Sequence, residues 1–244
     1  MSITSQLEVL RKRIDKASTQ AGRLPASVTL LAVSKTFGAD AVIEAVQAGQ
    51  RAFGENYVQE GVEKILALRA WSQAQDPSLA KEGGASPTLQ WHCIGPLQSN
   101  KTRPVAEHFD WVHSVDRLKI AQRLSEQRPA HLPPLQVCLQ VNIDGGPNKA
   151  GVAPAQALAL AQAVAVLPRL VLRGLMTIPE PAPDFETALA VHRRTRALFE
   201  TLQASQPWPA PLDTLSMGMS ADLEAAVAGG STLVRVGTAI FGGR

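Results

Sequence analysis

A lysine close to a run of apolar residues is the first candidate for chemistry in this chain. The run is VTLLAV (28–33), and Lys35 follows it in the sequence AVSKTF. If the run is a strand of a parallel barrel, Lys35 lies at the end of the strand where such barrels carry their active sites. Partial burial lowers the pKa of a lysine amine and leaves it able to form a Schiff base with a carbonyl group. An ordinary surface lysine in a loop is the alternative, and Lys35 alone does not decide between them.

Two turns rich in small residues near the C-terminus could bind an anion. The segment LSMGMSAD (215–222) contains Ser216, and RVGTAIFGG (235–243) contains Gly237 and Thr238. Backbone amides at such turns are free to bind an anion where a helix begins, and many barrels bind phosphate in the loops after their last two strands. Together with the lysine after the first strand, these turns indicate a phosphorylated aldehyde, held covalently at one end and by amides at the other.

Two other residues have two interpretations each, and a third is notable for its rarity. Asn56, in FGENY (53–57), could contact a ligand or cap the next helix. His92 lies inside an apolar run, where a hydrogen-bonded core histidine is the alternative to an acid–base role. Tyr57 is the only tyrosine in the chain.

The elements that would position these residues alternate along the chain. Eight apolar runs indicate strands: 28–33, 51–54, 89–95, 109–115, 135–143, 170–178, 212–219 and 232–237. Helical patterns lie between several of them: 40–48, 56–70, 116–127, 154–167, 184–204 and 221–228.

Eight strand–helix units in 244 residues predict one (β/α)8 barrel over residues 1–244. A leading amphipathic helix is expected within about residues 1–24, and a surface loop at 72–88, which is rich in Ser, Ala, Gly and Pro. A doubly wound open sheet is the structural alternative. It is disfavoured because the first strand–helix turn, SKTFGAD, lacks the glycine pattern of a dinucleotide site.

Composition excludes several classes of protein. Hydrophobic residues make up 45% and charged residues 18%, as in a globular protein, and no apolar run approaches the ~18 residues of a membrane helix. The net charge is only +3 and aromatic residues are 5%, which disfavours nucleic-acid binding. Cys93 and Cys138 have no CxxC or histidine-rich neighbours, so neither a metal site nor a disulfide is expected. Two buried thiols fit a protein of the reducing cytoplasm.

Several blocks resemble the pyridoxal phosphate homeostasis proteins, which are related to the barrel domain of alanine racemase. The blocks are AVSKTF, FGENYVQE, WHCIGPLQSNK, HFDWVHSVDR, QVNIDGGPNKAGV, GLMTIPEP and LSMGMSADLEAAVAGGSTLVRVGTAIFG.

The resemblance implies that pyridoxal 5′-phosphate (PLP) is bound as an internal aldimine on Lys35. It further implies that Ser216 and the backbone of Gly237 and Thr238 hold the phosphate, and that Arg235 faces the pyridine nitrogen. Asn56 is expected near the ring or the lysine.

A protein that buffers, delivers or regulates PLP is the expected function. Racemisation needs a second base opposite the lysine. In the related racemases, a tyrosine from an additional domain of a partner subunit supplies it, and the chain ends soon after the last predicted strand. No catalytic residue is therefore assigned. The alternatives are a PLP-dependent racemase that uses His92 or water as second base, and a phosphosugar enzyme that uses Lys35. A monomer that serves PLP-dependent apoenzymes is expected.

Overall fold

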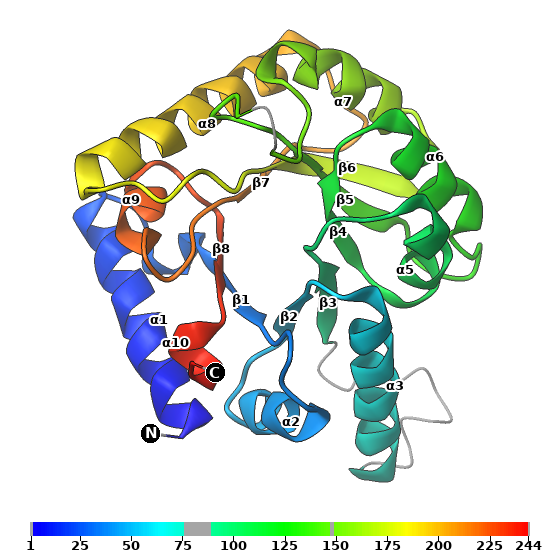
Figure 1. The fold of residues 1–244 in the computed structure, drawn as a ribbon, viewed down its shortest axis with the longest axis vertical. Helices are drawn as coiled ribbons and strands as arrows, with labels where there is room; N and C mark the ends of the chain where they lie inside the picture. Colours follow the sequence, from blue (N-terminus) through cyan, green and yellow to red (C-terminus); the bar gives the residue numbers. More distant parts are fainter. Residues whose placement is uncertain (1, 76–88, 147–148, 244) are drawn as a thin grey trace.

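Eight parallel strands form a closed barrel in the computed structural model, which describes residues 2–75, 89–146 and 149–243. Each strand pairs with its neighbours in sequence, and β1 also pairs with β8 to close the barrel (Figure 1). This arrangement confirms the predicted barrel and excludes the open sheet. The strands are β1 Thr29–Val33, β2 Ala52–Glu55, β3 Gln90–Cys93, β4 Trp111–Val115, β5 Leu135–Gln140, β6 Leu170–Met176, β7 Thr214–Ser216 and β8 Leu233–Val236.

Each of the eight predicted runs coincides with one strand. Seven strands are shorter than their runs and lie within them, whereas β2 extends one residue beyond the run 51–54, to Glu55. The run 212–219 shows the difference, because β7 has only the three residues Thr214–Ser216. The buried residues Met217 and Gly218 continue the apolar pattern beyond the strand, and Gly218 has a φ of +94°. Burial at a strand end therefore extends the apolar run past the last paired residue.

The helices surround the barrel (Figure 1). Their bounds are α1 Ile3–Gln20, α2 Ala39–Gln47, α3 Val58–Gln75, α5 Thr102–His108, α6 Leu118–Gln127, α7 Ala157–Ala165, α8 Phe185–Ser205, α9 Leu223–Ala228 and α10 Thr238–Phe241. Short 3-10 turns cover Pro25–Ser27, Ser99–Lys101 and Pro154–Gln156. The predicted loop at 72–88 is wrong in its first part, because α3 continues to Gln75; the rest of it, 76–88, lies outside the described residues.

The leading helix α1 packs against the outside of the barrel beside α9 and α10 (Figure 1). Its side chains Leu7, Leu10 and Ile14 are buried at helical spacing, and the Ser2 hydroxyl caps its first turn by accepting from the amide of Ser5. The predicted N-terminal helix is thus confirmed. It extends the main apolar core, which lies between the barrel and the helices.

Separate clusters of buried side chains come from the strands themselves. One contains Leu31 and Leu233, from the neighbouring strands β1 and β8, and another joins Trp111, Cys138 and Met176 from β4, β5 and β6. A row of buried polar side chains also comes from the strands. None of the helices in the described part of the chain combines the length and apolar content that crossing a bilayer requires.

Candidate functional site

A cavity of about 530 Å³ opens at the carboxyl end of the barrel. Its walls come from residues at or after the ends of six strands, β1, β2, β3, β6, β7 and β8. Five of the six residues expected at a ligand site line it: Lys35, Asn56, Arg235, Gly237 and Thr238. The volume lies within the range of about 300–1,000 Å³ that is typical of small-molecule sites. The closed barrel thus brings together residues separated by some 200 positions in sequence.

Lys35 lies on a tight turn directly after β1. The turn is closed by a hydrogen bond of 3.1 Å from the amide of Phe37 to the carbonyl of Ser34. Lys35 is half-buried, and Phe37 stacks on Phe241 of α10, with 5.2 Å between ring centroids. This stacking joins the lysine loop to the segment that contains Gly237 and Thr238.

Arg235 of β8 is a buried cation beside the cavity. Its side chain is 4% exposed, and its Nη1 donates to the Ser216 carbonyl (2.6 Å) and hydroxyl (2.7 Å). Its Nη2 donates to the carbonyl of Thr177 at 2.8 Å. No carboxylate of the described residues pairs with it, and burial lowers its pKa to about 10. The guanidinium therefore stays charged at neutral pH and has N–H groups left over for a ligand.

A chain of hydrogen bonds continues from Arg235 through Ser216 into the barrel interior. Nδ1 of His113 lies 2.8 Å from the Ser216 hydroxyl, and its Nε2 lies 2.8 Å from Nδ1 of His92. Burial lowers the pKa of His92 to about 3 and that of His113 well below its usual value, so both rings are neutral. Because the Ser216 oxygen accepts from Arg235, its proton is free for His113, which in turn donates to His92.

Two residues of this chain that the sequence analysis considered for the site do not line the cavity. Ser216 is fully buried and does not line the cavity, because its side chain is held between Arg235 and His113. The structure therefore places it behind Arg235 rather than in the cavity wall. His92 is also buried beneath the cavity, stacked on Trp111, and does not line it.

Ser220 is a cavity residue that the sequence analysis missed. It lies in the loop after β7, beside Gly237 and Thr238 in the cavity wall, and its hydroxyl forms no hydrogen bond to another described residue. A Cβ on Gly237 would come within 2.9 Å of the Val33 carbonyl oxygen, so glycine allows this turn to approach β1. No side chain caps α10 at Gly237. The sequence signal for Ser220 is its place in the small-residue segment 215–222, four residues after Ser216 at the end of β7.

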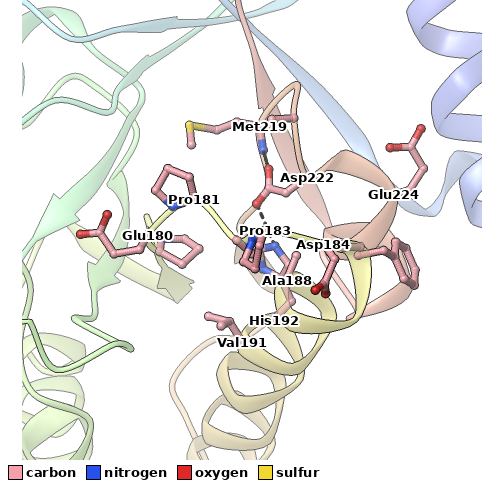
Figure 2. A pocket seen from close by; sticks show the side chains of 15 residues that line it. Glu180, Pro181, Pro183, Asp184, Ala188, Val191, His192, Met219, Asp222 and Glu224 are labelled. Atoms are coloured by element: carbon pink, nitrogen blue, oxygen red, sulfur yellow. Dashed lines mark hydrogen bonds and ion pairs between the residues drawn. The ribbon is translucent and has the colours of Figure 1, made fainter.

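A neighbouring pocket of about 480 Å³ shares the loop after β7 with this cavity (Figure 2). Asp222 connects the two: it accepts from the amide of Met219 at 2.7 Å and contacts Nε2 of His192 at 2.9 Å (Figure 2). Met219 and Ala221 line both spaces. Neither lysine nor arginine is among the described residues that line this pocket, so of the two spaces only the first contains a lysine.

The other sequence expectations concern groups away from the cavity. Cys93 and Cys138 are buried free thiols, and burial raises the pKa of each to about 12, which makes them unreactive. Within the described ranges, no group of three or more His, Cys, Asp or Glu side chains is placed to hold a metal ion. Tyr57 is 56% exposed and is not part of the cavity wall.

Ser216, at the end of β7, and Ser220, in the loop after it, give a matched test of this geometry. Ser216→Ala is expected to lower the free energy of unfolding by about 1–3 kcal/mol, because Arg235 and His113 lose a buried partner. Ser220→Ala is expected to change it by less than about 0.5 kcal/mol. Urea unfolding of both variants measures the difference, and equal stabilities would contradict the assigned hydrogen-bond chain.

Known proteins with similar sequences cover the whole chain. Residues 6–244 match the family model described as alanine racemase, N-terminal domain. A pyridoxal phosphate homeostasis protein of Pseudomonas aeruginosa is 55% identical over 243 residues, which are 100% of this chain and 96% of that protein. The protein of the same name from Vibrio cholerae is 54% identical over 243 residues, covering 100% and 97% of the two chains.

A solved structure extends the similarity to the fold. PipY of Synechococcus elongatus PCC7942, solved with PLP bound, is 39% identical, with a TM-score of 0.78 and coverage of 99% of this chain and 100% of that chain. This match agrees with the closed barrel. The chain belongs to the family of pyridoxal phosphate homeostasis proteins, which carry the alanine racemase N-terminal-domain fold.

Proposed function

We propose that this protein stores PLP covalently on Lys35 and releases it for other proteins. The observation that carries the proposal is a single cavity that contains a lysine amine, a buried arginine and an uncapped turn of small residues. An aldehyde, a ring nitrogen and a phosphate are the three groups of PLP that these residues can bind. PLP bound to an amine acts as an electron sink for carbanions.

The lysine amine supplies the covalent contact in this proposal. Lys35 would hold PLP through its amine, which can condense with the aldehyde group with loss of water. Asn56 lines the cavity from the end of β2, where its amide can contact the ring or the lysine. Release is the reverse reaction with water, so storage requires no other reactant.

Two sets of donors hold the remainder of the cofactor. Arg235 would face the pyridine nitrogen with the N–H groups that its contacts to Ser216 and Thr177 leave over. The backbone amides of Gly237 and Thr238, with the hydroxyls of Ser220 and Thr238, would hold the phosphate. We assign to Ser220 the phosphate role first expected for Ser216. Ser220 lines the cavity, and its hydroxyl forms no hydrogen bond to another described residue.

Storage rather than turnover is supported by the acid–base groups around the cavity. Among the described residues that line it, Lys35 and Arg235 are the only ionisable side chains. A guanidinium donates hydrogen bonds and does not accept a proton, so it keeps a pyridine nitrogen unprotonated and weakens carbanion stabilisation. A second base opposite the lysine is what a racemase needs. The monomeric state, the cytoplasmic location and the recipient apoenzymes stay predictions.

Replacing the lysine tests the covalent bond. Wild-type protein mixed with PLP is expected to be yellow, and borohydride is expected to fix PLP to the peptide that contains Lys35. Lys35→Ala is expected to lose both signals, whereas Lys119→Ala, an exposed lysine of α6, is expected to retain them. Attachment of PLP at another lysine in the wild type would overturn the assignment.

The phosphate end is tested by comparing PLP with pyridoxal. Ser220→Ala and Thr238→Val are each expected to weaken PLP binding about tenfold, since each removes a hydroxyl beside a charged phosphate. Binding of pyridoxal, which has no phosphate, is expected to change less than twofold. Titration by visible absorbance measures both ligands, and equal loss for the two would show that these hydroxyls do not contact phosphate.

Incubation with alanine in heavy water tests for turnover. The PLP-loaded protein is expected to exchange the α-hydrogen of D- or L-alanine far more slowly than the ~1–1,000 turnovers per second of typical enzymes. Mass spectrometry of recovered alanine measures the exchange. Exchange at enzymatic rates that disappears in Lys35→Ala would replace storage by racemase chemistry.

A further inference from the structure

The backbone that carries Lys35 is strained. Thr36, the next residue in the turn, has a φ of +69°, and Arg169 is the only other non-glycine residue with positive φ in the described ranges. Thr36 stands at the third position of the turn closed between Ser34 and Phe37, where a positive φ is normally supplied by glycine. A β-branched side chain makes this conformation especially unfavourable. Such strain persists only where surrounding contacts hold it.

Side chains of β2 and α3 hold the backbone on both sides of the lysine. On one side, the amide of Thr36 donates to Oε1 of Glu60. On the other side, Lys64 Nζ donates to the carbonyl of Ser34 at 2.6 Å, and the Ser34 hydroxyl donates to Oε1 of Glu55 at 2.6 Å. Lys64 also contacts the two carboxylates, each at 2.7 Å, and so joins both sides. We call Glu55, Glu60 and Lys64 the turn clamp.

Two of the three charged side chains of the turn clamp are buried. The side chain of Lys64 is 5% exposed and that of Glu55 is fully buried. Burial raises the pKa of Glu55, opposed by its contacts with Lys64 and Ser34, and its Oε2 has no partner among the described residues. Apolar residues in place of a buried ion pair are often as stable or more stable. The hydrogen bonds of the turn clamp to Ser34 and Thr36 indicate a role in holding the turn rather than in stabilising the fold.

We propose that Glu60 and Lys64 are positioning residues, which hold the strained turn so that the Lys35 amine stays directed into the cavity. The effect on PLP retention rests on the proposed covalent storage of PLP. The turn clamp itself holds the turn in the protein without ligand as well. When the hydrogen bond to Thr36 is removed, the turn relaxes toward negative φ. The amine then leaves the position in which a bound aldehyde is retained.

Hydrogen exchange of the PLP-free protein tests the clamp without any cofactor. In Glu60→Ala, the amides of residues 34–37 are expected to exchange about tenfold faster than in the wild type. Glu63→Ala is the matched control, because Glu63 lies one turn along the same helix, is exposed and does not contact the lysine turn. Its exchange in this segment is expected to equal that of the wild type. Equal exchange in both variants would overturn the proposal.

Release of PLP provides the second measurement. Glu60→Ala is expected to lose PLP about tenfold faster than Glu63→Ala, and Glu60→Gln, which retains an oxygen acceptor, is expected to lie between Glu60→Ala and the wild type. If PLP is bound through Lys35 and released equally fast from Glu60→Ala and Glu63→Ala, the clamp is wrong while storage stands. If Lys35 forms no bond to PLP but exchange in the turn still depends on Glu60, storage is wrong while the clamp stands.

A double-mutant comparison separates positioning from general destabilisation. Thr36→Gly removes the cost of the positive φ, because glycine adopts it readily. In this background, Glu60→Ala is expected to speed PLP release by less than about threefold rather than tenfold. An effect of Glu60→Ala that is the same with threonine and with glycine at position 36 would show that the clamp does not act through the strained turn.

Discussion

The buried charge of Arg235 is the constraint on which the interior of this barrel depends. A guanidinium without a carboxylate partner needs acceptors that are neutral, and it finds them in two carbonyls and the Ser216 hydroxyl. Ser216 then has its proton free for His113, which connects to His92. Neutral histidines satisfy this chain without a second positive charge beside the first. The polar row therefore crosses the barrel from β8 to β3 as one connected arrangement.

The same arrangement favours holding a cofactor over using one. Arg235 donates hydrogen bonds without exchanging protons, and the histidines lie beneath the cavity rather than in its wall. The cavity is also supported at both ends. The turn clamp holds the lysine loop, and Asp222 holds the loop of Ser220 through the amide of Met219. A site held by these hydrogen bonds, with one lysine as its base, supports the proposed covalent storage of PLP.

The sequence predicted the strands well, because alternating apolar runs and helical patterns are local signals. It was less successful at strand ends. Ser216 and Ser220 stand four residues apart in one small-residue segment, and which of them reaches the cavity depends on where β7 ends. The Ser216 hydroxyl instead forms a hydrogen bond with His113, which is 103 residues away in sequence. The loop at 72–88 was mistaken at its start for a similar reason, since α3 extends past the composition change to Gln75.

The sequence by itself determined the eight strand–helix units, the lysine after the first strand and the small-residue turns after the last two strands. These features follow from periodicity and residue type, which can be read from short stretches of the sequence. Only the tertiary structure decided which polar side chains face the cavity and which support it. Lys64, Glu60 and Glu55 look like ordinary charged residues of β2 and α3 in the sequence. Their contacts with the lysine turn exist because the closed sheet places β1, β2 and α3 together, and burial then makes each unsatisfied charge costly.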